Sequence, residues 1–161
     1  MNIFKPFDCE DEDLNDFLLN NSKKFLIALL AVTYLIESDH ETVAFFSIFN
    51  DKVTHEDFPS KNQWIKFRKG IISSEKQFKS YPAVKIGRLG VTTNWKGKQI
   101  GTAILDYLKE LLVDNNITGC KLITVDAYSN SLGFYEKNGF KYLTSMDLGE
   151  DTRLMYYNLI A

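Results

Sequence analysis

The sequence predicts a mixed α/β fold in a single domain over residues 1–161. One observation is a strand–helix–strand pattern between residues 83 and 127, which requires a parallel strand pair joined by a right-handed crossover. Another is a pair of apolar runs around a short polar loop, the pattern of an antiparallel hairpin. The chain is also 45% hydrophobic, which suits a domain of this length with a sizeable core. Together these observations predict a mixed sheet with helices around it.

The first predicted element is a helix over residues 8–26, with Asp8 as its N-cap and acids in the first turn, where the helix dipole favours them. Its apolar residues fall on one helical face: Leu14, Phe17, Leu18 and Phe25. The hairpin follows, with strands over 30–37 and 42–49 and the loop at 38–41. These three elements account for the first third of the chain.

An insert over residues 50–80 separates the hairpin from the next strand. We expect it to be irregular, with short helices around 63–69 and 74–79, and an insert of this length is often functional. The strand over 83–93 follows, and it contains Gly87 and Gly90. Glycine inside a strand marks a bulge or a close approach by another backbone or a ligand.

The second half of the chain begins with the clearest amphipathic pattern of the sequence. Its helical face comprises Ile100, Ala103, Ile104, Tyr107, Leu108, Leu111 and Leu112. The apolar run 120–127 predicts a buried central strand. Residues 129–140 predict a short helix that ends at Asn138-Gly139, because glycine is favoured just past a helix end. Two further strands are predicted over 140–146 and 152–160.

Composition excludes several classes of protein. The longest apolar stretch, 25–36, is shorter than the roughly 20 residues of a membrane span. The N-terminal residues are acidic, unlike a signal or transit peptide, so we expect a cytoplasmic protein. Cys9 and Cys120 fit neither a metal nor a disulfide spacing, so we expect both to be reduced and structural, and we expect no bound metal.

Charge is distributed unevenly along the chain. The net charge of −2 argues against a dedicated nucleic-acid binder, and the acids concentrate over residues 8–16. Residues 52–79 carry seven basic and three acidic side chains, a local charge of +4. Two interpretations stay open: ordinary solvated surfaces, or a basic face that binds an anionic partner.

The segment VTTNWKGKQIGTAIL, residues 91–105, places a glycine-containing basic turn before a helix. A helix N-terminus presents unpaired amides and a positive dipole end, and glycine allows a phosphate to approach them. Lys96 and Lys98 add positive charge to the turn. The alternative from the residues alone is a turn that merely joins the strand to the helix.

Residues 88–105 resemble the cofactor motif of the GNAT acetyltransferase superfamily, a strand followed by Arg/Gln-x-x-Gly-x-Gly/Ala and a long helix. Here Lys96 stands where Arg or Gln is usual, Gln99 replaces the first glycine, and Gly101 matches. Gln99 can serve if its φ is negative, with Gly97 supplying the freedom of the turn. The resemblance implies the GNAT fold, with a central mixed sheet of about six to seven strands flanked by helices.

A second motif lies about 40 residues further on, where NSLGFYEKNGF is similar to the closing motif of the same family. The matching residues are Phe134, Tyr135, Glu136, Lys137, Gly139 and Phe140. Without the resemblance, this segment is an amphipathic helix with a C-cap, with Phe134 and Phe140 in the core. Residues 7–18, the hairpin and 82–91 also resemble a branch that includes toxins of toxin–antitoxin pairs, which acetylate the amino group of aminoacyl-tRNA.

The resemblance implies an acetyl-CoA-dependent N-acetyltransferase in which a primary amine attacks the thioester directly. Acetyl-CoA would be held by Leu89, Gly90, Val91, Lys96, Gly97, Lys98, Gln99, Ile100, Gly101, Thr102 and Asn130. Gly90 would let the pantetheine arm lie close to the strand, and the Val91 amide would serve the acetyl carbonyl. Tyr135 would act as general acid toward the leaving sulfur. Asn130 has an alternative role as a helix N-cap.

A general base is missing from the strand that holds the acetyl group, since residues 81–93 contain neither a carboxylate nor a histidine. An α-amine titrates near 8 and a lysine amine near 10.4, so the gap favours an α-amine or a water relay to a carboxylate elsewhere. Candidate carboxylates are Glu37, Glu41 and Asp126. His40 and His55 are expected at the surface. For Arg88 we expect contact with either a substrate phosphate or a structural carboxylate such as Asp126.

Several functional alternatives stay open at this stage. The acceptor could be a small amine, a protein terminus or the α-amine of an aminoacyl-tRNA, and in the last case an antitoxin partner is expected. Family members are often dimers, so a homodimer is a further expectation. A protein of another class, a non-catalytic acyl-CoA-binding regulator, would bind acetyl-CoA without turnover.

Overall fold

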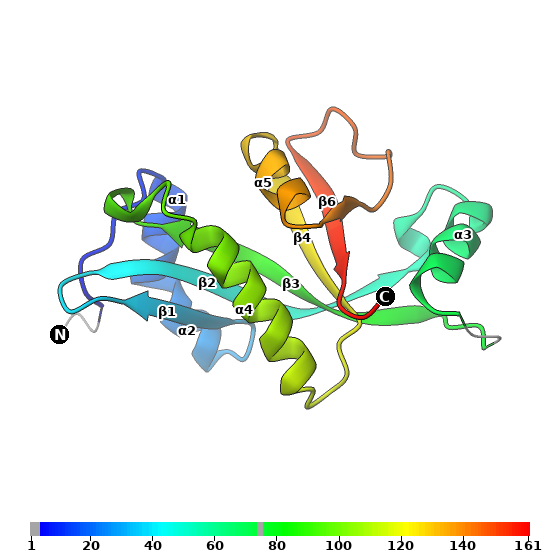
Figure 1. The fold of residues 1–161 in the computed structure, drawn as a ribbon, viewed down its shortest axis with the longest axis horizontal. Helices are drawn as coiled ribbons and strands as arrows, with labels where there is room; N and C mark the ends of the chain where they lie inside the picture. The colour runs from blue at the N-terminus through cyan, green and yellow to red at the C-terminus, as the bar shows by residue number, and fades with distance from the viewer. Residues whose placement is uncertain (1–3, 74–75) are drawn as a thin grey trace. The chain divides into compact units, whose positions relative to one another are not determined.

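The computed structural model describes residues 4–73 and 76–161 as a mixed α/β protein with one six-stranded sheet (Figure 1). The strand order is β1-β2-β3-β4-β6-β5, and the sheet is mixed, as the sequence predicts. The chain divides into two compact units, the first comprising Met1–Phe49 and Ile86–Leu108 and the second Asn50–Lys85 and Lys109–Ala161. Strands β2 and β3 contribute residues to both units.

The first unit opens with three short helical segments that cover an aromatic core. They are α1 (Glu12–Asp16), the π-helical η1 (Phe17–Asn21) and α2 (Ser22–Ile27). Phe17 and Leu18 pack with Phe45 in this core, as the helical spacing predicts. The predicted N-cap is wrong, however, because the carboxylate that accepts from the Leu14 amide belongs to Asp11 and not to Asp8.

The hairpin is confirmed as β1 (Val32–Glu37) paired antiparallel with β2 (Thr42–Thr54). The first unit also contains the end of β3 (Ser80–Val91), the 3₁₀ turn η3 (Thr93–Trp95) and the first part of α4 (Ile100–Asp114). The buried residues of α4 are Ile104, Leu105 and Leu108, whereas Ala103 and Tyr107 of the predicted face are exposed. The buried stripe is therefore rotated toward Leu105, which keeps the same three- and four-residue spacing.

The second unit contains the remaining helices and strands. They are η2 (His55–Asp57), α3 (Lys61–Ile71), β4 (Leu122–Tyr128), η4 (Ser129–Ser131), α5 (Leu132–Lys137), β5 (Lys141–Tyr142) and β6 (Thr152–Asn158). Strand β6 pairs antiparallel with both β4 and β5. Trp64 of α3 packs with Phe58 and Tyr81 in a second core, so α3 is fixed to its unit by aromatic contacts.

Three predictions for the less regular segments are wrong in detail. Residues 50–54 continue β2 instead of beginning an irregular insert. Of the helix expected over 74–79, residues 74 and 75 lie outside the described residues, and 76–79 are not helical. The strand expected over 140–146 is only the two residues of β5. In each case the segment was too short for its apolar pattern to decide between helix, strand and turn.

The glycines of β3 allow a close approach by aromatic side chains. A Cβ on Gly87 would lie 2.9 Å from Phe49, and one on Gly90 would lie 3.0 Å from Phe45 and 3.3 Å from Phe7. The nearest neighbours are thus phenylalanine rings, and the Ser47 carbonyl oxygen also lies 3.7 Å from a Cβ on Gly87. A side chain at either position would press against these rings.

Candidate functional site

The turn between β3 and α4 contains two residues with left-handed backbone. Gly97 has a φ of +74° and Gln99 a φ of +59°. The expectation of a negative φ at Gln99 is therefore wrong, because this glutamine adopts a conformation that glycine adopts readily and other residues rarely do. The Gln99 carbonyl accepts from the Ala103 amide at 3.1 Å, so α4 begins directly after the left-handed residue.

The start of α4 has the properties of an anion site. The helix is 15 residues long, and its first turn carries no acidic side chain. Its first amides have no intrahelical acceptors, and the helix dipole places partial positive charge there. Ile100, Gly101 and Thr102 provide these amides, and the exposed Lys98 lies beside them in the sequence. The donors present here suit a pyrophosphate.

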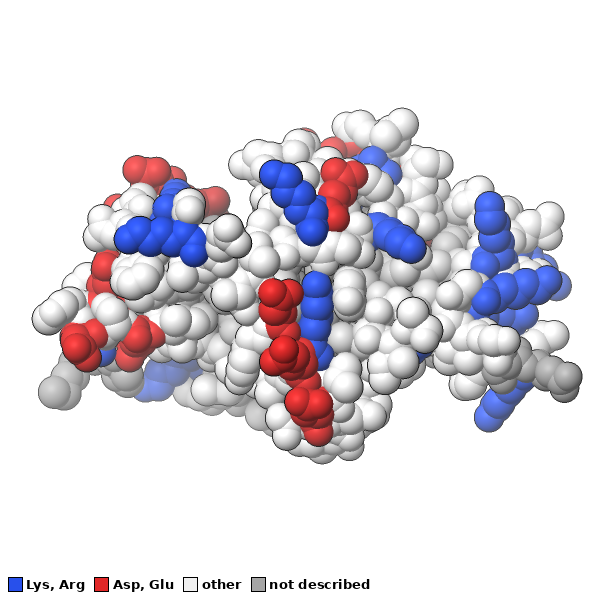
Figure 2. All heavy atoms as spheres, in the orientation of Figure 1, with Lys and Arg blue, Asp and Glu red and all other residues white. Residues whose placement is uncertain are grey.

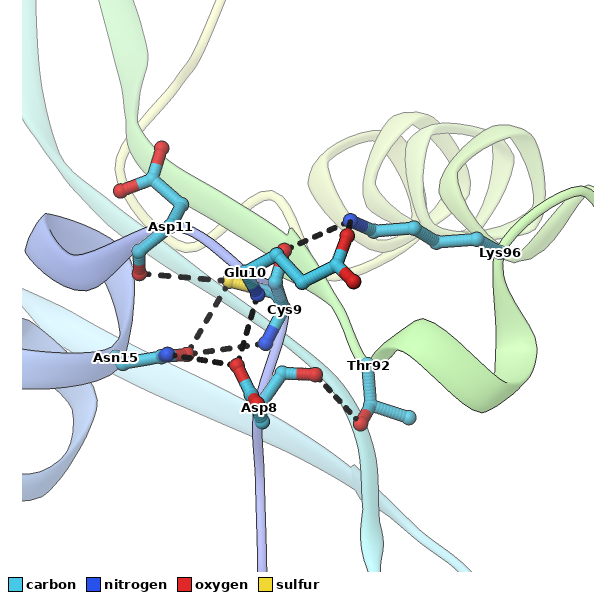
Figure 3. A network of polar contacts seen from close by, with 7 residues as sticks. All are labelled: Asp8, Cys9, Glu10, Asp11, Asn15, Thr92 and Lys96. Atoms are coloured by element: carbon cyan, nitrogen blue, oxygen red, sulfur yellow. Dashed lines mark hydrogen bonds and ion pairs between the residues drawn. The ribbon is translucent and has the colours of Figure 1, made fainter.

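Two residues of the N-terminal segment hold one side of this turn. The Asp8 carbonyl accepts from the Thr93 amide at 2.9 Å and from the Thr92 hydroxyl at 3.0 Å. Lys96 reaches back from the turn, and its Nζ donates to the Cys9 carbonyl at 2.7 Å (Figure 3). The same ammonium lies 3.5 Å from Glu10 Oε2. The charge of Lys96 is thus already engaged by residues 9 and 10.

The N-terminal segment is itself ordered by side-chain hydrogen bonds (Figure 3). Asp8 Oδ1 accepts from the Glu10 amide at 2.8 Å and from Asn15 Nδ2 at 3.0 Å. These two hydrogen bonds hold the pKa of Asp8 below its ordinary value, the bond from Glu10 having the larger effect. Asn15 also accepts from the Cys9 amide at 3.1 Å. The carbonyls that hold the turn are therefore fixed in place.

Glu41, in the hairpin loop, holds the same turn through other donors. Its Oε1 accepts from Trp95 Nε1 at 3.0 Å, and its Oε2 accepts from Asn94 Nδ2 at 3.3 Å. Lys98 Nζ lies 4.8 Å from the centroid of the Trp95 ring, a cation–π distance. Neither Asp8 nor Glu41 was predicted to contact the turn, because each is more than 50 residues from it in the sequence.

Arg88 has a structural partner, but not the one that we expected. Its Nε lies 3.6 Å from Asp13 Oδ2, and its guanidinium lies 4.9 Å from the centroid of the Phe17 ring. Asp126 is instead paired with Lys85, at 2.8 Å. Arg88 therefore connects β3 to the N-terminal helical segments of its own unit.

The other candidate bases and the two histidines are placed as follows. Glu37 lies 3.8 Å from Lys5 and accepts from the Thr42 hydroxyl at 3.4 Å. His40 and His55 are exposed, as predicted. Among the described residues, no group of three or more His, Cys, Asp or Glu side chains could hold a metal ion. Strand β3 itself contains no carboxylate side chain.

Tyr135, in the second unit, is buried on the short helix α5. Its side chain is 6% exposed, and its ring contacts Phe134 and Phe140 at centroid distances of 5.0 and 5.3 Å. Burial raises the pKa of Tyr135 to about 12, so the phenol keeps its proton at neutral and moderately alkaline pH. Gly139 has a φ of +86° and ends the helix as predicted.

Asn130, in η4, does not cap this helix. The N-cap position of α5 is Ser131, and no side chain there accepts a capping hydrogen bond. Asn130 is exposed, and its Oδ1 accepts from the Ser131 hydroxyl at 3.3 Å. The alternative role of Asn130 as an N-cap is therefore wrong. Asn130 and Tyr135 lie in the second unit, and the predicted residues between Leu89 and Thr102 lie in the first.

Helix α3 is the most basic element of the second unit. It carries Lys61, Lys66, Arg68 and Lys69 and no acidic residue. On the face that Figure 2 shows, Lys and Arg side chains gather over α3.

Cys9 and Cys120 are free cysteines, as predicted, and burial raises the pKa of both thiols. No helix in the part of the chain that the structure describes is long and apolar enough to cross a membrane.

Comparisons with known proteins give a consistent result. The model of the acetyltransferase (GNAT) domain family matches residues 31–142. A crystal structure of a tyrosine-to-phenylalanine mutant of KacT is 20% identical, with a TM-score of 0.74, and the match covers 95% of this chain and 85% of that one. A search of curated proteins gives no match.

Two structures of AtaT are similar to the same extent. AtaT complexed with an acetyl-methionyl-tRNA is 19% identical, with a TM-score of 0.72, over 94% of this chain and 85% of that one. AtaTR bound with acetyl-CoA is also 19% identical at a TM-score of 0.72, over 97% and 86% of the two chains. At these identities the likeness shows a shared fold.

Proposed function

Because the chain belongs to the GNAT acetyltransferase family, and is thus an acetyl-CoA-dependent N-acetyltransferase, we propose that it acetylates an α-amine carried by RNA. The turn before α4 is the observation that supports the cofactor site. Two left-handed positions, Gly97 and Gln99, precede a long helix whose first turn lacks acids. The pyrophosphate is proposed to bind the amides of residues 98–102.

The remaining cofactor contacts are proposed from the motifs. Leu89, Gly90 and Val91 would lie along the pantetheine arm, with the Val91 amide donating to the acetyl carbonyl, and Asn130 would bind the arm as well. Acetyl-CoA supplies an acetyl group already activated as a thioester. Donors that are fixed before the reaction stabilise developing negative charge better than donors that must reorganise.

Tyr135 is proposed to donate its proton toward the leaving sulfur. Its raised pKa, about 12, supports a donor that stays protonated at working pH. The raised pKa also limits the proton transfer. A thiol has a pKa of about 8.5, so complete transfer of the proton from a phenol with a pKa of about 12 to the leaving thiolate is unfavourable. The hydroxyl therefore contributes mainly as a hydrogen-bond donor while the carbon–sulfur bond breaks.

The acceptor is proposed from proton chemistry and charge. Glu37, Glu41 and Asp126 are engaged by other side chains, and residues 81–93 offer no base, so the amine should arrive partly neutral. An α-amine near pKa 8 meets this condition at neutral pH and a lysine side chain does not. The four basic residues of α3 support an anionic carrier, and a solved structure of the similar protein AtaT is complexed with an acetyl-methionyl-tRNA.

The test is acetyl transfer to an aminoacyl-tRNA compared with transfer to the corresponding free amino acid amide. We expect the tRNA-linked amine to react with the lower KM, and log affinity for tRNA to fall linearly with log salt. The triple variant Lys66→Ala, Arg68→Ala, Lys69→Ala should weaken tRNA binding. It should also reduce the slope of log tRNA affinity against log salt, while acetyl-CoA affinity is retained.

A matched control for the triple variant is Lys23→Ala with Lys24→Ala, two basic residues of α2 in the first unit. This variant should leave tRNA affinity close to wild type. Equal reactivity of the free amide and the tRNA-linked amine, together with no tRNA binding at low salt, would refute the RNA-linked acceptor. A small-molecule or peptide amine would then be the acceptor to test.

A further inference from the structure

Glu41 contacts the cofactor turn although it lies in the loop of the β1–β2 hairpin. Its two carboxylate oxygens accept from two different side chains of η3, Trp95 Nε1 at 3.0 Å and Asn94 Nδ2 at 3.3 Å. Both carboxylate oxygens are therefore occupied by donors of the turn. These contacts argue against the role of general base that the sequence left open for Glu41.

We propose that Glu41 is a positioning residue that holds the turn 92–99 in its acetyl-CoA-binding conformation before the cofactor arrives. The inference rests on the proposed cofactor site. It assigns Glu41 no contact with acetyl-CoA, since Glu41 acts through Trp95 and Asn94. The indole that Glu41 orients also lies under the ammonium of Lys98, at 4.8 Å, so the position of this cation depends on the same hydrogen bond.

The turn is held on its other side by the N-terminal segment. The Asp8 carbonyl accepts from Thr93, and Lys96 donates to the Cys9 carbonyl at 2.7 Å. Both sets of attachments lie at residues 92–96, and the left-handed Gln99, whose conformation costs free energy, follows them in the same turn. A turn that these attachments order in advance loses less entropy on binding.

The sign of the effect separates positioning from simple electrostatics. Glu41 carries a negative charge, and a negative charge beside a pyrophosphate site repels the ligand. If Glu41 acted only through its charge, Glu41→Gln would strengthen acetyl-CoA binding. Positioning predicts the opposite, because the glutamine NH₂ cannot accept from one of the two donors and the turn loses an attachment.

The experiment compares Glu41→Gln with Asp39→Asn, which removes a charge from the same hairpin loop at an exposed residue. We expect the Kd for acetyl-CoA, measured by calorimetry, to rise roughly 5–30-fold in Glu41→Gln, the effect of one lost charge-assisted hydrogen bond. It should stay at the wild-type value or fall slightly in Asp39→Asn. In Glu41→Gln, kcat at saturating acetyl-CoA should change far less than the KM for acetyl-CoA.

Hydrogen exchange of the free protein gives a readout that needs no ligand. The amides of residues 93–102 should exchange faster in Glu41→Gln than in wild type, and those of the Asp39→Asn variant should not. If Glu41→Gln fails to fold, Trp95→Phe keeps an aromatic ring and removes the indole N–H that donates to Glu41 Oε1. It should raise the acetyl-CoA Kd in the same direction.

Two outcomes separate this inference from the proposed site. If Gly101→Asp abolishes acetyl-CoA binding while Glu41→Gln and Trp95→Phe bind as tightly as wild type or more tightly, the positioning role of Glu41 is overturned and the site remains. If Gly101→Asp binds acetyl-CoA normally, the site itself is refuted and the role of Glu41 is refuted with it.

Discussion

The substitution Gln99→Gly tests how this turn replaces the glycine that is usual in the family motif. Gln99 has a φ of +59°, within the left-handed region, and its side chain is exposed. Glycine adopts this conformation without a steric cost, so the backbone of the turn should be unchanged in the variant. Only the strain at residue 99 and the freedom of the unfolded chain should differ.

The expected magnitude follows from these two terms. A non-glycine L-residue in the left-handed region costs about 1–2 kcal/mol. Glycine adds conformational entropy to the unfolded chain, which offsets about 0.4–1 kcal/mol of that gain. The net stabilisation is therefore about 0.5–1 kcal/mol, which corresponds to roughly 1–4 °C in Tm for a chain of this size. Acetyl-CoA affinity should stay within about three-fold of wild type, since the amides of residues 100–102 keep their directions.

Urea unfolding of two controls isolates the backbone term. Gln99→Ala removes the exposed side chain and keeps the strain, so its stability should match wild type. Leu29→Gly relieves the same strain outside the cofactor turn, because Leu29 has a φ of +56° and a 91% exposed side chain. It should be stabilised to a similar extent with unchanged acetyl-CoA affinity. A Gln99→Gly protein that is less stable than wild type, or that binds acetyl-CoA more than ten-fold differently, would refute the reasoning.

Two further substitutions test the cofactor turn and the acid stability. Gly101→Asp should keep the fold, since an acid suits the first helical turn, yet calorimetry should show acetyl-CoA binding weakened at least about 100-fold by charge repulsion. Asp147→Asn should cost roughly 1–2 kcal/mol at pH 7, because Asp147 accepts from Arg153 Nε and from the Leu154 amide, both at 2.6 Å. These bonds outweigh burial and lower the pKa of Asp147, so its contribution is present above the unfolded pKa of about 3.9 and disappears as pH falls through the folded pKa. The difference between the variant and wild type in urea unfolding should therefore shrink at pH 3; an equal difference at both pH values would exclude this origin.

Features that depend on local spacing were predicted well from the sequence. The hairpin, the turn before α4 and the end of α5 at Gly139 each rest on a few neighbouring residues with strong conformational preferences. The buried face of α4 was predicted in part: Ile104 and Leu108 are buried as expected, whereas Ala103 and Tyr107 are exposed. Leu105 is buried in their place, and only packing, which the spacing does not reveal, selects it.

Features that depend on distant contacts could not be predicted. The contacts of Asp8 and Glu41 with the turn join segments more than 50 residues apart, and no spacing rule connects them. The sign of φ at Gln99 was missed for a related reason. A glutamine adopts a left-handed backbone only where the fold around it requires one, and residue spacing does not reveal such a place. The sequence therefore indicated the cofactor, but not how the turn between β3 and α4 is held.

The missing base and the raised pKa of Tyr135 together determine how the rate should depend on pH. If no enzyme group removes a proton from the amine, as proposed, kcat/KM for the acceptor should rise with pH until the amine itself is neutral. That plateau begins near or below pH 8 for an α-amine and above pH 10 for a lysine side chain, so the profile distinguishes the two acceptor classes. Because the pKa of Tyr135 is about 12, the rate should not fall at pH 10, where an ordinary phenol would lose its proton.

Tyr135→Phe should lower the rate by about 10²–10⁴-fold at every pH and leave the shape of the profile unchanged. Single-turnover measurements are needed so that product release does not mask the chemical step, and a variant with the wild-type single-turnover rate would show that Tyr135 is a packing residue.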